Sequence, residues 1–541
     1  MSLLAIDALT LAIRGTPLLR GVSLALQPGQ TLGLVGESGS GKSLTALAAM
    51  GLLPEGATTT GSITFDGRDL LRTPEPQLCR LRGRRIGMIF QEPMTALNPV
   101  QPIGDQVAET LRIHTSAPRA DAHRIAAEKL ARVGLPTDRI PPSRFPHELS
   151  GGQRQRVCIA MAVALRPALL IADEPTTALD VTTQMQILRL LKSLVAEEGM
   201  ALMLITHDLA VVSGLADRVA VMSEGRVVEE NATEPLFRAM CHPYTRQLFA
   251  ASDHRPARTS LPLGAPLLQV DGATRDYALP RTHLFRRRPS FRAVSDVSLT
   301  LHQGESVGLV GESGCGKSTL TRAILGLEPL QQGRIHLDGQ PVGPGMPPTL
   351  RAKVQVVFQD PYGSFNPRHR IARAVAEPFH LLPAPPRGAA RRAAVAEALE
   401  AVGLTAADMD KYPHEFSGGQ RQRLAIARAL IIRPALIVLD EAVSALDVSV
   451  RARILDLLAD LQTRFGLTYL FISHDLAVVR AITDRVLVMQ SGRIVEEGPT
   501  DRVFDHPSHP YTRALVAATP RIPAHWVPAA PCPNAGVGQQ G

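Results

Sequence analysis

Two eight-residue segments carry the residue types that bind nucleotide phosphates. GESGSGKS occupies residues 36–43, and GESGCGKS occupies residues 311–318. Each follows a short apolar run, TLGLV or SVGLV, and the first precedes LTALAAMGLL, a stretch of helical composition. Glycines let backbone N–H groups curl around phosphate oxygens, and a helix N-terminus adds partial positive charge. A Gly-rich turn that binds nothing is the alternative, but the context occurs twice and favours a phosphate loop.

Individual roles follow from the chemistry of the two loops. Lys42 and Lys317 are predicted to reach the β- and γ-phosphates of ATP, and Ser43 and Ser318 to hold Mg²⁺. The residues predicted to contact nucleotide are Gly36, Glu37, Ser38, Gly39, Ser40, Gly41, Lys42 and Ser43 in the first loop, and Gly311, Glu312, Ser313, Gly314, Cys315, Gly316, Lys317, Ser318 and Thr319 in the second.

Two pairs of adjacent acids each follow an apolar run. ALLIAD ends at Asp173 and ALIVLD ends at Asp440, and Glu174 and Glu441 come next. A carboxylate at the carboxyl end of a buried parallel strand is well placed for Mg²⁺ beside phosphates, which predicts Asp173 and Asp440 as ligands. Glu174 and Glu441 point to the other side of the strand end and are predicted to polarise the attacking water. A solvated loop start is the plainer alternative, which the accompanying phosphate loops disfavour.

The motifs recur because the chain contains a duplicated unit. Six blocks return in the same order, among them FQEP as FQDP, PHELSGGQRQR as PHEFSGGQRQR, ITHDLAVV as ISHDLAVV, and HPYTR unchanged. Duplication of a whole domain, rather than an array of short repeats, explains why the two copies of each block lie so far apart in the sequence. We predict the domains to be residues 1–250 and 266–520, joined by a polar linker at 251–265 and followed by a disordered tail at 521–541.

Composition bounds the function without choosing it. The chain has 541 residues and a net charge of +8, which a solvated surface, an anionic membrane face or nucleic acid would each accommodate. The start does not resemble a signal peptide, and no run of about 18 apolar residues predicts a membrane span. The five cysteines form no CxxC pair, which suits a reducing cytoplasm. The basic insert with Arg286, Arg287 and Arg288 is typical of an exposed loop rather than a binding patch.

With LSGGQ at 149–153 and FSGGQ at 416–420, the chain resembles the ABC ATPase family. The resemblance implies an α/β fold with two tandem P-loop NTPase (ABC ATPase) domains, each a mixed sheet core with a helical subdomain. It also implies that the two cassettes pair, so that the signature segment of one closes over ATP held by the other. The signature residues expected to contact ATP are Ser150, Gly151, Gly152 and Gln153, and Ser417, Gly418, Gly419 and Gln420.

Further roles carry over from the family by position. Gln91 and Gln359 match the glutamine that links Mg²⁺ and water to the helical subdomain. Asp180 and Asp447 match the acid that communicates between the two sites, and His207 and His474 match the histidine that contacts the γ-phosphate. Tyr277 matches the aromatic residue that stacks on adenine, and the first copy has Ile13 at that position.

The same motifs, with HPYTR near each cassette's end, resemble the peptide-importer branch of the family, and in particular the fused subunits of glutathione and microcin C importers. This implies two membrane permease subunits, an extracytoplasmic solute-binding protein, no nucleic acid, and a peripheral position on the cytoplasmic face of the inner membrane. Some members bear a cysteine cluster for an iron–sulfur centre. Only Cys241 and Cys532 lie near the cassette ends here, so no cluster is expected.

The resemblance assembles two sites that should both hydrolyse ATP. Site one joins Lys42, Asp173, Glu174 and His207 to Ser417 and Gly419, and site two joins Lys317, Asp440, Glu441 and His474 to Ser150 and Gly152. Movement of the helical subdomains, near 92–160 and 360–428, would then drive the permease.

Three other functions involve proteins with similar cassettes. A soluble twin-cassette ATPase acting on ribosomes is the main rival, but such proteins join their cassettes by a long charged helix, and this linker is short and contains prolines. A DNA-repair ATPase would be expected to show zinc-ligand cysteines or a long coiled coil. An exporter stays open, because the cassette itself does not set the direction of transport.

Overall fold

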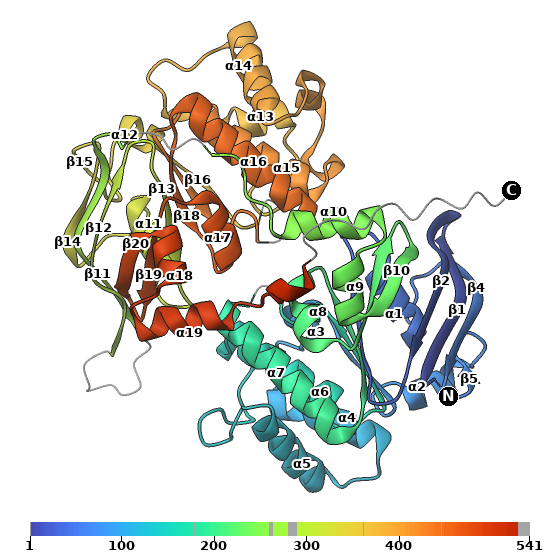
Figure 1. Ribbon diagram of the computed structural model, residues 1–541. Helices are drawn as coiled ribbons and strands as arrows, with labels where there is room; N and C mark the ends of the chain where they lie inside the picture. Colours follow the sequence, from blue (N-terminus) through green and yellow to red (C-terminus); the bar gives the residue numbers. More distant parts are fainter. Residues whose placement is uncertain are drawn as a thin grey trace, which may run out of the picture. The chain divides into compact units, whose positions relative to one another are not determined.

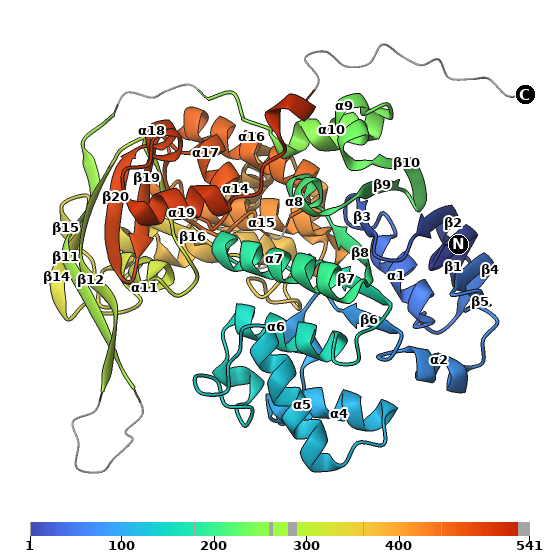
Figure 2. The same ribbon diagram turned by 60° about the horizontal axis from the view of Figure 1, so that its bottom comes forward.

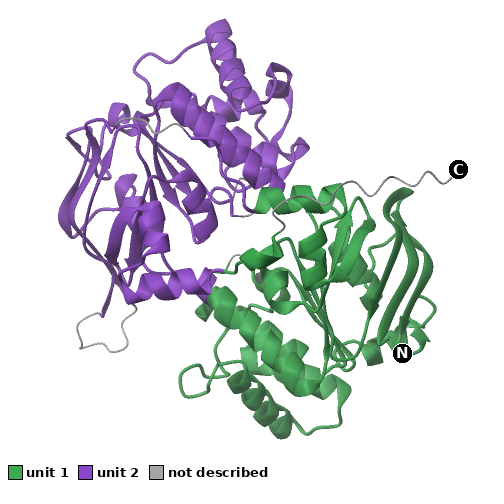
Figure 3. Ribbon diagram, in the orientation of Figure 1, with its two compact units in different colours: residues 1–179, 183–252, 520–541 green, residues 180–182, 253–519 purple. Residues whose placement is uncertain are grey.

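The computed structural model describes residues 2–177, 179–258, 263–279, 289–360, 362–444 and 446–527. Contacts divide the chain into two compact units, coloured separately in Figure 3. Unit 1 comprises residues 1–179, 183–252 and 520–541, and unit 2 comprises residues 180–182 and 253–519. The basic insert with Arg286, Arg287 and Arg288 lies outside the described residues, as does Cys532.

Unit 1 contains two β-sheets. The six-stranded sheet has the order β10-β9-β3-β8-β7-β6, in which only the β9–β10 pairing is antiparallel. Every residue of β3, β7 and β8 is buried, as expected for parallel strands covered on both faces. This sheet consists of β3 (Thr31–Val35), β6 (Ile86–Ile89), β7 (Leu169–Asp173), β8 (Ala201–Thr206), β9 (Arg218–Ser223) and β10 (Arg226–Ala232).

The second sheet of unit 1 is antiparallel, with the order β2-β1-β4-β5. It consists of β1 (Leu4–Ile13), β2 (Thr16–Leu26), β4 (Ala57–Phe65) and β5 (Arg68–Asp69). One hydrophobic core joins its strands to β3, β7 and β8 and to buried alanines of helix α1. The first phosphate loop therefore lies between a rigid strand and a helix that is itself part of this core.

Three helices of unit 1 form a subdomain of their own. Helices α4, α5 and α6 contact one another, and Figures 1 and 2 both show them side by side, in agreement with the helical subdomain predicted near 92–160. The helices of unit 1 are α1 (Lys42–Met50), α2 (Glu75–Leu81), α3 (Pro93–Ala96), α4 (Ile103–His114), α5 (Arg119–Arg132), η1 (Pro146–Glu148), α6 (Gly151–Ala162), α7 (Val181–Glu198), α8 (Leu209–Leu215), α9 (Thr233–Ala239), α10 (Pro243–Ser252) and η5 (Ala524–Trp526).

Unit 2 repeats this architecture. Its six-stranded sheet has the order β16-β17-β18-β13-β19-β20, which matches the order of unit 1 strand for strand when it is read from β20 to β16. Its second sheet has the order β12-β11-β14-β15, which matches β2-β1-β4-β5. The strands are β11 (Pro266–Ala278), β12 (Ser290–His302), β13 (Ser306–Val310), β14 (Gln332–Leu337), β15 (Gln340–Pro341), β16 (Val354–Val357), β17 (Leu436–Asp440), β18 (Thr468–Ile472), β19 (Arg485–Gln490) and β20 (Arg493–Pro499). The predicted fold class, two tandem α/β domains with mixed sheets, is confirmed.

The helices of unit 2 also correspond to those of unit 1. They are α11 (Lys317–Ile324), α12 (Pro348–Ala352), α13 (Ile371–Val375), η2 (Glu377–Leu381), α14 (Gly388–Ala401), η3 (Ala406–Asp410), η4 (Pro413–Glu415), α15 (Gly418–Leu430), α16 (Val448–Phe465), α17 (Leu476–Ile482), α18 (Thr500–Asp505) and α19 (Pro510–Ala518). Helices α13, α14 and α15 contact one another and form the second helical subdomain.

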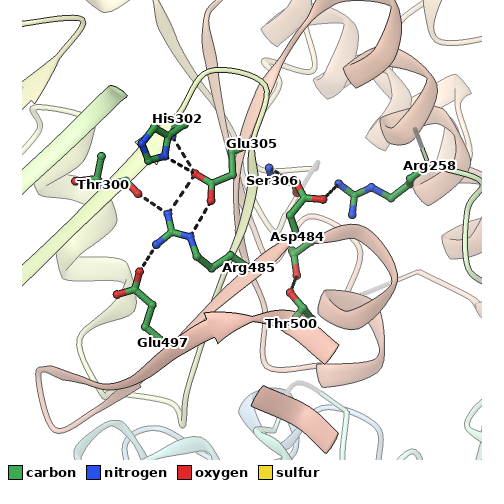
Figure 4. Close-up of polar contacts among 10 residues, drawn as sticks. Arg258, Thr300, His302, Glu305, Ser306, Asp484, Arg485, Glu497 and Thr500 are labelled. Carbon is green, nitrogen blue, oxygen red and sulfur yellow. Dashed lines mark hydrogen bonds and ion pairs between the residues drawn. The ribbon is translucent and has the colours of Figure 1, made fainter. Parts of the chain in front are cut away.

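The joining segment is bound to unit 2 at the start of β19 (Figure 4). Arg258 donates to Asp484 Oδ1 at 2.9 Å, and the other carboxylate oxygen of Asp484 accepts from the Ser306 N–H at 2.9 Å. The neighbouring Arg485 donates to Glu305 Oε1 at 2.7 Å and also pairs with Glu497 on β20. Residues 253–258 of the predicted linker therefore group with unit 2, whereas 251–252 end α10 and 259–262 lie outside the described residues.

The start of the predicted disordered tail is ordered in the structure. Residues 524–526 form η5, and the Trp526 ring stacks on Phe237 of α9, with ring centroids 6.1 Å apart. Burial of aromatic surface against α9 accounts for this order. Residues 528–541 lie outside the described residues.

Within the part of the chain that the structure describes, no helix is both long enough and apolar enough to cross a membrane.

Candidate functional site

The first phosphate loop is shaped by two glycines and one lysine. A Cβ at Gly36 would lie 2.3 Å from the Met222 carbonyl oxygen, so a side chain does not fit there. Gly41 has φ 102° and precedes α1, which begins at Lys42, two residues before the stretch predicted to be helical. The buried Lys42 ammonium donates to the carbonyls of Gly36 and Glu37, each at 2.8 Å. The loop therefore places a positive charge at a helix N-terminus, where phosphate oxygens bind.

The second phosphate loop has the same geometry. A Cβ at Gly311 would lie 2.2 Å from the Met489 carbonyl oxygen. Lys317, the first residue of α11, donates to the carbonyls of Gly311 at 2.6 Å and Glu312 at 2.9 Å. Cys315 replaces the serine found at position 40, and burial raises the pKa of its thiol. Both predicted loops are therefore formed in the structure.

An aspartate ends each of β7 and β17: Asp173 is buried and Asp440 is partly buried. Asp173 is 5% exposed, and its Oδ1 accepts a hydrogen bond from the Ser43 hydroxyl at 3.2 Å. Burial raises the pKa of Asp173, although the Ser43 hydrogen bond opposes the shift. Burial also raises the pKa of Asp440, and the adjacent Glu441 adds to the shift. A raised carboxyl pKa means that nearby positive charge does not offset burial, a condition that a bound cation would relieve.

The next residue, Glu174, is held in a different environment. Its φ is 47°, in the left-handed region, and its N–H donates to the Ile205 carbonyl at 2.9 Å. One carboxylate oxygen lies 3.2 Å from His207 Nδ1, and the other accepts from Gln91 at 3.1 Å and Thr177 at 2.9 Å. Burial alone would raise the pKa of Glu174, but the contacts with His207 and Thr177 lower it to about 2. Glu174 is therefore ionised near neutral pH.

Glu441 repeats this arrangement in unit 2. Its φ is 51°, its N–H donates to the Ile472 carbonyl at 2.9 Å, and its carboxylate lies 3.2 Å from His474 Nδ1. Burial would lower the pKa of His474, but the hydrogen bond with Glu441 raises it. Gln359 is exposed just after β16, at the position that corresponds to Gln91.

The two signature segments each begin a helix. Ser150 precedes α6, and its hydroxyl accepts from the Gln153 N–H at 3.3 Å while the Gln153 side-chain oxygen accepts from the Ser150 N–H at 3.0 Å. Ser417 and Gln420 make the same pair of hydrogen bonds before α15. Such reciprocal caps fix the start of a helix and leave its partial positive charge beside an exposed serine.

The remaining residues with roles implied by the family resemblance differ in their burial and contacts. Tyr277 lies beside α11, because its hydroxyl is 3.4 Å from Thr319 Oγ1 and donates to Glu328 at 2.5 Å. The Arg275 guanidinium lies over the same ring, 4.9 Å from its centroid. Ile13 is half-buried at the end of β1, Asp180 is buried before α7, and Asp447 precedes α16.

Two tyrosines contact the phosphate loops, and both lie in the HPYTR segments, which by sequence alone indicate only a family branch. The Glu37 N–H donates to the Tyr244 hydroxyl at 3.1 Å, and the Glu312 N–H donates to the Tyr511 hydroxyl at 2.9 Å. The available signal was the identical return of HPYTR in both copies.

Comparisons with known proteins identify relatives of this chain. The family model "ABC transporter" matches residues 19–177 and 294–444, and the model "Oligopeptide/dipeptide transporter, C-terminal region" matches residues 495–535. The chain is 48% identical to the glutathione import ATP-binding protein GsiA of Escherichia coli K12, over 93% of this chain and 86% of that protein. GsiA of Salmonella typhimurium is 47% identical over the same shares. Among solved structures, cbiO1 of Clostridium perfringens is 28% identical with a TM-score of 0.39, covering 44% of this chain and 91% of its own.

The geometry of the first loop predicts that Gly36→Ala weakens ATP binding in unit 1 by about tenfold or more, because the added Cβ displaces the loop from Met222. ATP titration of the purified chain measures this. Gly214→Ala is the matched control, because no atom lies within 4 Å of a Cβ placed there. Equal ATP affinity in the two variants would contradict the steric argument.

Proposed function

The chain belongs to the ABC transporter family, and we propose that it is the ATP-hydrolysing subunit of an importer of peptides or peptide-like solutes. The match of residues 495–535 to the oligopeptide/dipeptide transporter region carries the choice of substrate class. The extended identity to glutathione import ATP-binding proteins supports the same choice, because it covers both units. Two ATPase cassettes in one chain would supply the energy, and other chains would cross the membrane.

Hydrolysis in each unit would use the contacts described above. Lys42 would bind the β- and γ-phosphates, and Glu174, ionised near neutral pH, would accept a hydrogen bond from water and orient it toward the γ-phosphorus. Water oxygen would then bond to phosphorus as the bond to the β-phosphate oxygen breaks, and one water proton would pass to the Glu174 carboxylate, leaving ADP and phosphate. His207 would hold Glu174 and contact the γ-phosphate. Lys317, Glu441 and His474 would act in the same way in unit 2.

The residues at both strand ends fit Mg²⁺. The Ser43 hydroxyl and the buried Asp173 carboxylate are hard oxygen ligands within 3.2 Å of each other, and the raised pKa of Asp173 shows uncompensated burial. We propose that Ser43, Gln91 and Asp173 hold the ion in unit 1, and that Ser318, Gln359 and Asp440 hold it in unit 2. When bound with ATP, the ion would neutralise phosphate charge.

We further propose that the two cassettes complete each other's sites, as the family resemblance implies. Residues 150–153 would contact ATP bound by Lys317, and residues 417–420 would contact ATP bound by Lys42. The capped starts of α6 and α15 support this role, because each presents N–H groups and partial positive charge beside an exposed serine.

Coupling to transport would pass through the helical subdomains. We propose that these, near 92–160 and 360–428, contact two membrane permease subunits, and that an extracytoplasmic solute-binding protein delivers the solute. The chain would then lie on the cytoplasmic face of the membrane. The domain limits proposed for this arrangement are residues 1–250 and 266–520.

Action on ribosomes, the rival function, is not supported by the matches, which are to import ATP-binding proteins and a transporter region. Residues 253–258 of the joining segment contain no helix, whereas a twin-cassette protein acting on ribosomes would need a long charged one.

Glu174→Gln combined with Glu441→Gln should lower ATP turnover by about 10²-fold or more, because the amides cannot act as bases. ATP affinity should stay within about twofold of the wild-type value, because no phosphate ligand is removed. Steady-state phosphate release and ATP titration measure the two effects. Glu55→Gln with Glu400→Gln, at exposed positions, is the control for loss of two charges. Normal turnover in the Glu174/Glu441 variant would refute the assigned base.

Pairing of the cassettes predicts that two pairs of substitutions, each added to the chain that carries Glu174→Gln and Glu441→Gln, differ in the number of ATP molecules retained. Lys42→Ala with Ser417→Glu should damage only site one, so about one ATP stays bound per chain after rapid gel filtration. Lys42→Ala with Ser150→Glu should damage both sites, because glutamate repels phosphate, and about none should stay bound. Equal retention by the two variants would mean that each cassette does not use the other's signature.

Affinity purification from native membranes distinguishes the importer from its rival. The tagged chain should co-purify with membrane-embedded permease subunits in ATP-dependent amounts. A chain with Ser150→Glu and Ser417→Glu should lose the ATP dependence and serves as the control. Recovery of ribosomal proteins without permeases would overturn the importer proposal and leave the ATPase assignment intact.

A further inference from the structure

One peptide unit in each phosphate loop is held from both of its ends. The carbonyl of the unit that joins Gly36 to Glu37 accepts from Lys42 Nζ at 2.8 Å, and its N–H donates to the Tyr244 hydroxyl at 3.1 Å. Because a peptide unit is planar, rotation of this unit would break both hydrogen bonds together. Tyr244 thus acts on the same rigid plane as the lysine that is to bind phosphate.

Unit 2 contains the same arrangement with tighter distances. The carbonyl of Gly311 accepts from Lys317 Nζ at 2.6 Å, and the N–H of Glu312 donates to the Tyr511 hydroxyl at 2.9 Å. Tyr511 is 199 residues from Glu312 in the chain, and Tyr244 is 207 residues from Glu37. Both copies of the duplicated unit therefore bring a distant tyrosine to the corresponding peptide N–H.

The residues before each tyrosine fix its position. In unit 1 the Glu229 carboxylate on β10 accepts from the Cys241 N–H at 2.8 Å and the His242 N–H at 3.0 Å. His242 Nδ1 in turn accepts from the Tyr244 N–H at 3.2 Å. A strand of the central sheet therefore sets the start of α10, and α10 carries the tyrosine to the phosphate loop.

Unit 2 builds the same support from corresponding residues. The Glu496 carboxylate on β20 accepts from the Ser508 N–H at 2.8 Å and the His509 N–H at 3.0 Å. His509 Nδ1 accepts from the Tyr511 N–H at 3.2 Å and so caps α19. Burial raises the pKa of Tyr511, so its hydroxyl stays neutral and can accept the Glu312 hydrogen bond.

We propose that Tyr244 and Tyr511 are positioning residues that hold the first peptide unit of each phosphate loop in the orientation that ATP requires. The inference rests on the proposed phosphate sites, and it gives the HPYTR segments a physical role. Without the hydroxyl, the N–H of Glu37 or Glu312 loses its acceptor and the loop must be ordered when ATP binds. Ordering a loop on binding lowers affinity.

The experiment compares Tyr244→Phe, Tyr511→Phe and the double variant with a matched loss of a tyrosine hydroxyl elsewhere. Tyr469 supplies the control, because it is fully buried and its hydroxyl donates to the Leu458 carbonyl at 3.0 Å. It pairs with Ser306 at the start of β13, whereas the phosphate loop follows the other end of that strand.

The double variant should raise the KM for ATP about five- to tenfold, the size expected for one lost hydrogen bond, with kcat changed less than about twofold. Hydrogen exchange measured by mass spectrometry should quicken in the peptide containing Glu37 for Tyr244→Phe, and in the peptide containing Glu312 for Tyr511→Phe. Tyr469→Phe should lower the thermal midpoint and leave both the KM and the loop exchange unchanged.

Each outcome decides the proposal. An unchanged KM and unchanged loop exchange in the phenylalanine variants, with ATP bound by the wild-type chain, would overturn the positioning role alone. A KM raised equally by Tyr469→Phe would overturn it as general destabilisation. Failure of the wild-type chain to bind ATP would overturn the proposed phosphate sites themselves. If the double variant does not fold, loop-specific exchange in the two single variants decides in the same way.

Discussion

At the end of one strand in each unit, two adjacent carboxylates are partly withdrawn from water, and the surrounding contacts follow from that constraint: Asp173 is buried, whereas Glu174, Asp440 and Glu441 are partly buried. Adjacent negative charges in such a place repel each other, so they persist only when their environments differ. Burial raises the pKa of Asp173, which has Ser43 as its hydrogen-bond donor, whereas His207 and Thr177 outweigh the effect of burial at Glu174 and lower its pKa to about 2. The left-handed backbone of Glu174 separates the two side chains. One acid thus suits a cation, and the other suits water.

The phosphate loop meets this acid pair only because the sheet is built in a fixed order. Strand β3 lies between β8 and β9, with β7 next to β8, so the loop after Val35 and the acids after Ala172 meet at one edge of the sheet. The tyrosine of each HPYTR segment adds a third attachment, from β10 or β20 through a helix to the loop. The order of the strands therefore determines where the binding residues lie.

Local sequence predicted those parts of the site that neighbouring residues determine. The buried strand before Gly36, the helix that follows the first phosphate loop, and the helix opened by Ser150 all follow from short patterns. Contacts between distant segments were not predictable in this way, because no local pattern encodes their partners. Tyr244 reaches Glu37 across 207 residues, and Trp526 gains order only by stacking on Phe237. The family resemblance supplied roles for residues such as Gln91 that spacing alone does not assign.

A Mg²⁺ titration tests directly whether the two adjacent acids have separate tasks. The amount of ATP retained is measured at increasing Mg²⁺ concentrations in two double variants. The aspartate variant carries Asp173→Asn and Asp440→Asn, and the glutamate variant carries Glu174→Gln and Glu441→Gln. Loss of a ligand should raise the half-saturating Mg²⁺ concentration about tenfold in the aspartate variant, while the glutamate variant keeps the wild-type value. Equal shifts in the two variants, or a shift only in the glutamate variant, would contradict the account.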